Sequence, residues 1–66
     1  MKVQERVAEY VRDHGIRSSF IAEKTGMSKV IVSRIFGLKR EMSADEFELF
    51  CNALNKQPND FINIGD

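Results

Sequence analysis

Apolar residues recur along the first segment of the chain at the spacing of an amphipathic helix. They fall at i, i+4, i+7, i+8 and i+11, in one stripe of a helix: Val3, Val7, Tyr10, Val11 and His14. Gly15 is expected to end this helix, because glycine readily adopts the left-handed conformation found at helix C-termini. His14 directly precedes that glycine, so we expect a cap or rim residue near the last carbonyl groups rather than a ligand or a catalytic base.

Two shorter helices are predicted next, joined by a tight connection. The first starts near Ser18 and ends at Gly26, and the second has Ser28 as its N-cap and runs from Lys29 to Phe36. Two short helices joined through a glycine-containing turn are the helix-turn-helix arrangement. A small residue for the helix crossing, a glycine for a turn with positive φ, and two branched apolar residues that lock the helices together occur at matching positions: Ala22, Gly26, Val32 and Ile35.

The rest of the chain predicts two further helices after a loop at 38–42. Ser43 and Glu46 have the spacing of a capping box, with a hydroxyl at the N-cap and a carboxylate three residues on. The helix that they begin carries apolar residues at helical spacing: Phe47, Phe50, Cys51 and Leu54. Pro58 suits the first position of a last short helix. The expected buried residues of that helix are Phe61 and Ile62. No segment has the pattern of a strand, so the sequence predicts an all-α bundle of about five short helices.

Length and composition limit the function without changing this fold. Sixty-six residues, 42% hydrophobic and 30% charged, are enough for one small globular domain, which we place at 1–66. The longest apolar runs have three residues, so we expect no membrane span, no secretion signal and a cytoplasmic protein. One cysteine, expected to be buried, and one histidine leave no internal disulfide and no zinc site. We therefore expect no enzyme, no metal, no cofactor and no small-molecule ligand.

The helix predicted at 29–36 has two different faces. One side carries the apolar residues Val32, Ile35, Ile31 and Phe36. The other side carries short or cationic side chains: Lys29, Val30, Ser33 and Arg34. Arginine and lysine donate to guanine, serine bonds to several bases, and valine contacts the thymine methyl group, so this set suits the reading of base edges. The other interpretation of the pattern is a solvated helix face that contains two cations.

The charges are segregated along the chain although the formal net charge is zero. Residues 17–40 hold six basic residues and one acidic residue, a net charge of +5. Residues 41–66 hold one basic and six acidic residues, a net charge of −5. The excess positive charge thus lies on the segment that a helix-turn-helix presses against DNA, and overall neutrality does not exclude a nucleic-acid partner.

Several segments together match a known pattern: 20–28, 33–35, 39–40, 43–47, 53–54, 58–59 and Phe61. On these segments, residues 16–62 resemble the DNA-binding domain of phage Cro and C1 repressors, which has the lambda-repressor-like five-helix fold. The resemblance is strongest to the small regulators of Gram-positive phages and mobile elements. It implies that four residues of the second short helix face the major groove: Lys29, Val30, Ser33 and Arg34.

The resemblance also implies contacts to the DNA backbone from the start of the first short helix and from the loop after the second: Arg17, Ser18, Ser19, Lys39 and Arg40. Ser18 stands where the family often has a glutamine that contacts phosphate, and Ser19 or a helix N-terminal amide is expected to supply that contact instead. Leu38 stands where the family often has glycine, and Gly37 is expected to serve the same turn. Phe36 replaces a common polar residue and is expected to belong to the core.

The function expected from these features is sequence-specific binding of double-stranded DNA by a Cro/C1-type transcriptional repressor. Such domains usually bind as two-fold homodimers on half-sites about one helical turn apart. Candidate dimer residues near the C-terminus are Phe61, Ile62 and Ile64, of which Phe61 also suits the core and Ile64 is the best interface candidate. The apolar side of the helix at 47–54 is a further candidate surface. The alternative that the sequence leaves open is a helical adapter whose basic segment binds an acidic protein partner.

Overall fold

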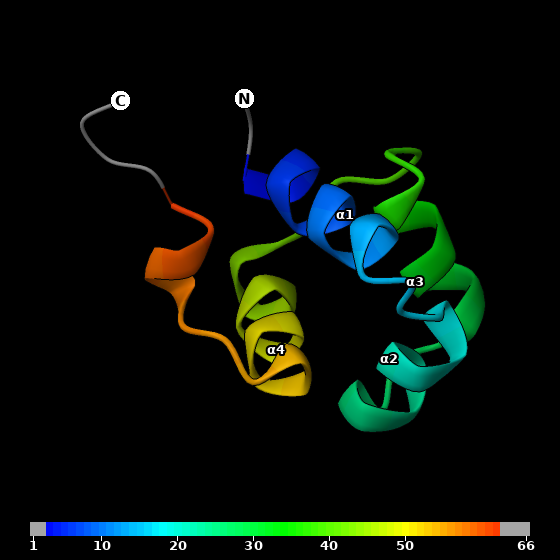
Figure 1. Cartoon of the computed structure of the whole chain (residues 1–66). Coiled ribbons are helices and arrows are strands. Elements are labelled where there is room, and N and C mark those ends of the chain that lie inside the picture. Colours follow the sequence, from blue (N-terminus) through cyan, green and yellow to red (C-terminus); the bar gives the residue numbers. More distant parts are fainter. Residues whose placement is uncertain (1–2, 63–66) are drawn as a thin grey trace.

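Four α-helices and one 3₁₀ turn make up the part of the chain that the structure, a computed structural model, describes, residues 3–62. The elements are α1 (Val3–Asp13), α2 (Ser18–Thr25), α3 (Lys29–Phe36), α4 (Ala44–Leu54) and the turn η1 (Pro58–Asp60) (Figure 1). No strand occurs among these residues, which confirms the all-α prediction. The loop predicted at 38–42 is also present between α3 and α4.

The last predicted helix is a single 3₁₀ turn. The carboxylate of Asp60 accepts the backbone N–H of Gln57 at 2.8 Å and closes the turn. Phe61 is the C-cap of this turn, its N–H donates to the Pro58 carbonyl at 3.0 Å, and its side chain is buried in the core. The turn places Phe61 among the apolar residues of α1 and α4, and such short 3₁₀ pieces are typical connectors.

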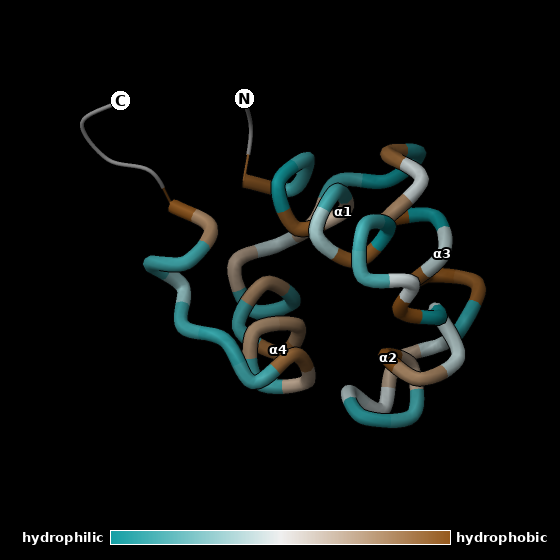
Figure 2. The backbone as a smooth tube through the Cα atoms, in the orientation of Figure 1, coloured by the Kyte–Doolittle hydropathy of each residue, from teal (hydrophilic) through white to brown (hydrophobic). Residues whose placement is uncertain are grey.

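The helices pack in a chain of neighbours around two apolar clusters. Helix α3 packs on α2 and α1, and α4 packs on α2 and η1 (Figure 1). The first cluster joins α1, α4 and the residue after η1 through Val7, Val11, Cys51 and Phe61. The second joins α2, α3 and α4 through Ile21, Val32, Ile35 and Phe50. In Figure 2 the connection between α4 and η1 is hydrophilic, whereas each helix alternates between hydrophobic and hydrophilic positions.

The two clusters are continuous with each other. The same four half-buried residues pack against both of them: Ile16, Phe36, Met42 and Leu54. Phe36 stacks at a tilt on Phe50, with 5.0 Å between ring centroids. Phe36 is therefore a core residue, as the sequence predicts.

The predicted helix starts are confirmed by their side-chain hydrogen bonds. The Ser28 hydroxyl accepts the N–H of Val30 at 3.2 Å and caps α3. Ser43 and Glu46 form the expected capping box at α4, since each side chain accepts the backbone N–H of the other. These bonds satisfy backbone donors that a helix leaves unpaired at its N-terminus.

Three helices end on the same C-terminal motif, in which one residue takes the left-handed conformation. The N–H group after that residue bonds to the carbonyl five positions earlier, as in Ile16 to Val11 at 3.0 Å and Lys39 to Arg34 at 2.8 Å. The left-handed residues are Gly15 (φ +63°), Leu38 (φ +60°) and Asn55 (φ +57°). His14 is exposed and its Nδ1 donates to the Tyr10 carbonyl at 2.9 Å, which confirms its role as a cap.

The expectation that Gly37 serves the turn after α3 is wrong. Gly37 has φ at −83°, an ordinary value, and Leu38 takes the left-handed conformation instead. In this motif the left-handed residue directly precedes the residue whose N–H bonds five positions back. That donor is Lys39, which bonds to the Arg34 carbonyl, so the left-handed residue is Leu38, one position after the glycine. A leucine there costs about 1–2 kcal/mol of conformational energy that a glycine would not.

Candidate nucleic-acid interface

The turn between α2 and α3 is held by bonds local to it. The N–H of Gly26 donates to the Ala22 carbonyl at 2.9 Å, and Gly26 has φ at +76°. A Cβ atom added to Gly26 would meet nothing within 4 Å, so the turn needs glycine for its conformation and not for space. Thr25, which sequence reasoning missed, donates its hydroxyl to the Ile21 carbonyl at 2.7 Å and accepts the N–H of Met27 at 3.2 Å. A threonine directly before the glycine is the signal that could have identified it.

Three of the four predicted helix-turn-helix core residues lie on the inner side of this pair. Val32 and Ile35 are fully buried, and Ala22 is half-buried against the same cluster as both of them. Gly26 is exposed at the turn and acts through its backbone. The two branched residues therefore fix α3 on α2 and α4, which orients the opposite side of α3 toward solvent.

The structure brings the four predicted base-contact residues together on that opposite side. Lys29, Val30, Ser33 and Arg34 are all exposed, Val30 by 61%. With Lys39 from the following loop, these four residues line an open hollow of about 450 Å³. Two cations from the helix, one from the loop, one hydroxyl and one apolar side chain thus meet at one surface. This combination can donate to guanine, bond to several bases and contact a thymine methyl group.

The predicted backbone contacts at the start of α2 lie in two other places. Arg17 is the N-cap of α2 but makes no side-chain capping bond, and Arg17 and Ser19 line a hollow with Phe20 and Glu23. Ser18 is half-buried and lines a different hollow, beside Phe36 and Leu38. Lys39 therefore lies beside the exposed face of α3, whereas the residues at the start of α2 form a separate patch.

Residues 6–66 match the family model described as the Cro/C1-type HTH DNA-binding domain. The chain belongs to this family. Comparison with curated proteins and with solved structures gave no match. Members of this family bind DNA, as the sequence analysis predicts. The family is not one of enzymes, which also agrees with the sequence analysis. The fold expected from the resemblance is confirmed as well.

The net positive charge of this Cro/C1-type domain lies on the helix-turn-helix and its following loop. All six basic residues of 17–40 are exposed: Arg17, Lys24, Lys29, Arg34, Lys39 and Arg40. Exposed cations attract phosphates and release counterions when they bind them. In residues 3–62 no helix is long and apolar enough to cross a membrane, and no group of histidine, cysteine and carboxylate side chains is arranged to hold a metal ion.

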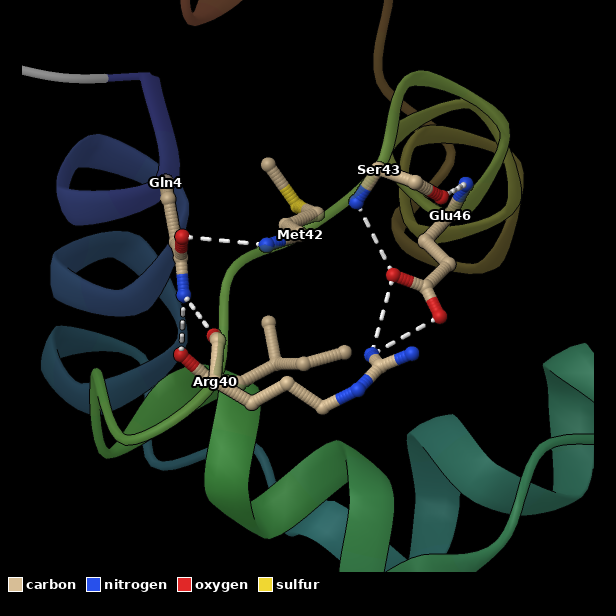
Figure 3. Close-up of polar contacts among 6 residues, drawn as sticks. Gln4, Arg40, Met42, Ser43 and Glu46 are labelled. Atoms are coloured by element: carbon tan, nitrogen blue, oxygen red, sulfur yellow. Dashed lines mark hydrogen bonds and ion pairs between the residues drawn. The ribbon is translucent and has the colours of Figure 1, made fainter.

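Arg40 of the Cro/C1-type domain is already paired within the chain. Its Nη1 lies 3.0 and 2.9 Å from the two carboxylate oxygens of Glu46, and the two side chains are 41% and 16% exposed (Figure 3). The backbone N–H of Ser43 and the guanidinium of Arg40 hold the pKa of Glu46 below its ordinary value of 4.5, against the opposing effect of partial burial. Since Nη1 of Arg40 is engaged with Glu46, a phosphate that binds Arg40 has to use the other guanidinium nitrogens, Nε and Nη2.

Gln4 of α1 contacts the loop from the other side, and sequence reasoning missed it. Its side-chain nitrogen donates to the carbonyls of Ile35 and Arg40 at 2.8 and 2.6 Å, and its oxygen accepts the N–H of Met42 at 3.1 Å (Figure 3). These partners lie 31 to 38 residues away along the chain, so no local pattern could have revealed them.

The candidate dimer residues do not form an exposed patch in the described part of the domain. Phe61 is 5% exposed and packs in the first cluster, and Ile62 is half-buried. Ile64 lies outside the described residues. On α4 the aromatic residues Phe47 and Phe50 face the core, whereas Leu49 is 40% exposed.

Proposed function

We propose that this Cro/C1-type domain is a sequence-specific transcriptional repressor that binds an operator with α3 in the major groove of double-stranded DNA. The observation that carries the proposal is the grouping of Lys29, Val30, Ser33, Arg34 and Lys39 around one exposed hollow, opposite the buried Val32 and Ile35. A helix held in this way presents its outer face to a groove without disturbing the core.

Each residue of this face has a role suited to its chemistry. Arg34 and Lys29 donate to O6 and N7 of guanine, Ser33 bonds to a neighbouring base, and Val30 packs on a thymine methyl group. The backbone contacts are made by Arg17, Ser18, Ser19, Lys39 and Arg40. The N-terminal amides of α2 beside Ser18 and Ser19 supply donors to phosphate where a longer side chain is absent.

The domain acts by occupying the operator and excluding RNA polymerase. It binds as a homodimer whose two α3 helices enter the major groove about 34 Å apart, one turn of B-DNA. The selected site should therefore be palindromic, with half-sites about one turn apart.

The test begins with selection of binding sites from random duplex DNA by the purified protein. On the selected site Arg34→Ala should lose about 1–3 kcal/mol of binding free energy and tolerate more bases at one position. Lys39→Ala should weaken binding to all sequences similarly and reduce the slope of log K against log salt by about 0.9. Both effects are measured by fluorescence anisotropy of labelled duplexes over a range of salt concentrations.

Lys56→Ala is the matched control, because it removes one positive charge from the connection between α4 and η1. It should leave the sequence preference and most of the affinity unchanged. Equal affinity of the wild type and Arg34→Ala for the selected site would overturn the assignment of the reading face. Failure to enrich any sequence would overturn specific DNA binding and favour the adapter function.

A further inference from the structure

The amide of Gln4 is fully used by the last turn of α3 and by the loop that follows it. An amide side chain has two N–H donors and an acceptor oxygen, and here both donors reach carbonyls while the oxygen accepts an N–H. The opposite orientation of the amide would place its oxygen against the carbonyls of Ile35 and Arg40, so the three partners define one orientation (Figure 3).

We propose that Gln4 is a positioning residue for DNA binding, which holds the loop at 37–42 so that Lys39 stays beside the reading face of α3. This inference rests on the proposed function. Gln4 itself does not reach the DNA in this proposal, because its amide is engaged with the backbone of the loop.

The backbone on both sides of Lys39 is fixed. On one side the N–H of Lys39 bonds to the Arg34 carbonyl at 2.8 Å, after Leu38 in the left-handed conformation. On the other side the Arg40 carbonyl accepts from Gln4 at 2.6 Å, and the next bond of Gln4 is to the N–H of Met42. Lys39, which lines the hollow that it shares with Arg34, therefore has an anchored backbone.

A fixed loop favours binding because less conformational freedom is lost when the complex forms. The ion pair of Arg40 with Glu46 holds the far side of the same loop against α4, and Met42 packs on both apolar clusters. Gln4 connects the loop to α1 by side-chain hydrogen bonds. Its loss should let the loop move relative to α3 while the apolar clusters stay packed.

The experiment uses Gln4→Met, which keeps the length of the side chain and removes all three hydrogen bonds. Affinity for the selected operator duplex is measured at a temperature where circular dichroism shows every variant fully folded. Gln4→Met should weaken binding about tenfold in the wild-type background. In a Lys39→Ala background the same change should cost less than about twofold, since the residue that it positions is gone.

A second cycle with Lys29→Ala separates positioning from a general effect on the fold. Lys29 lies on the same face but on α3 itself, so Gln4→Met should still cost about tenfold in that background. An equal loss in the wild-type, Lys39→Ala and Lys29→Ala backgrounds would overturn the proposal and leave Gln4 a stabilising residue. No loss in any background would overturn it as well.

Hydrogen exchange tests the clamp without DNA. In Gln4→Met, which removes the acceptor of the Met42 N–H, the amide of Met42 should exchange faster while that of Phe50 in α4 is unchanged. Asn52→Met, a change at an exposed amide side chain on α4, is the control and should leave the Met42 amide unaltered. Unchanged exchange at Met42 in Gln4→Met would overturn the clamp, whereas failure of Arg34→Ala to affect operator binding would overturn the proposed function instead.

Discussion

Replacement of Glu46 by glutamine isolates the contribution of one charge at the start of α4. Oε1 of Glu46 accepts the Ser43 N–H at 2.9 Å, and both oxygens face Nη1 of Arg40. Glutamine keeps an acceptor oxygen for the Ser43 N–H and removes the negative charge. The variant therefore loses the ion pair with Arg40 and the favourable interaction with the positive end of the α4 dipole, and it keeps the size of the side chain.

The magnitude follows from these two losses. A partly exposed ion pair contributes up to about 1 kcal/mol, and a carboxylate in the first turn contributes about 0.3–1 kcal/mol. We expect Glu46→Gln to lower the free energy of unfolding by about 1 kcal/mol near neutral pH. The whole core of so small a domain supplies only about 3–5 kcal/mol, so the change is readily measured.

The effect should depend on pH with a defined sign. The pKa of Glu46 is lowered in the folded state, by the Ser43 N–H first and by Arg40 next, from an ordinary value of 4.5. The stability that the ionised carboxylate contributes is therefore complete above pH 4.5 and is lost as the pH falls through the lower, folded-state pKa. The difference between the wild type and Glu46→Gln should shrink toward zero in strong acid.

The assay is urea unfolding followed by circular dichroism, near neutral pH and again near pH 3. Glu48→Gln is the control, because it removes a charge from an exposed position of the same helix. A free-energy difference for Glu46→Gln that is equal at the two pH values would refute the reasoning. An equal loss in Glu48→Gln would refute it too, since the effect would then arise from net charge alone.

Two further predictions concern the turn and the core. Gly26→Ala should lower the free energy of unfolding by about 1 kcal/mol in urea titrations, because alanine disfavours φ at +76°, and an unchanged midpoint would contradict the account of the turn. Cys51 is 2% exposed and burial raises the pKa of its thiol, so an aromatic disulfide reagent should modify it only as the domain unfolds. Rapid modification without denaturant would show that the first cluster is open.

The features that sequence predicts correctly are those set by near neighbours. The sequence predicts Ser28 and Ser43 as caps, because the hydrogen bonds of a cap reach only two or three residues along the chain. The exposed and buried faces of 29–36 followed from helical periodicity, which the buried Val32 and Ile35 confirm. Local spacing was therefore sufficient for the helix-turn-helix and for the face that it presents.

The features that sequence does not predict depend on contacts between distant residues or on the exact backbone conformation at the end of a helix. Gln4 meets its partners only after the chain has folded back by more than thirty residues. Helix α3 ends at Phe36 as predicted, but its cap Gly37 has an ordinary φ and the left-handed position falls on Leu38. The pairing of Arg40 with Glu46 changes what Arg40 can offer to a phosphate, and charge counts along the sequence treat it as one more free cation.

Helix α3 divides its eight residues between two independent tasks. Four residues hold it to the rest of the molecule, namely Ile31, Val32, Ile35 and Phe36, while the four outward positions take no part in the apolar clusters. A helix of two turns is too short to persist alone, so its shape is imposed by its neighbours and not by the residues that it displays. Substitutions at the outward positions can consequently accumulate during evolution without unfolding the domain, and one stable scaffold can acquire new binding preferences.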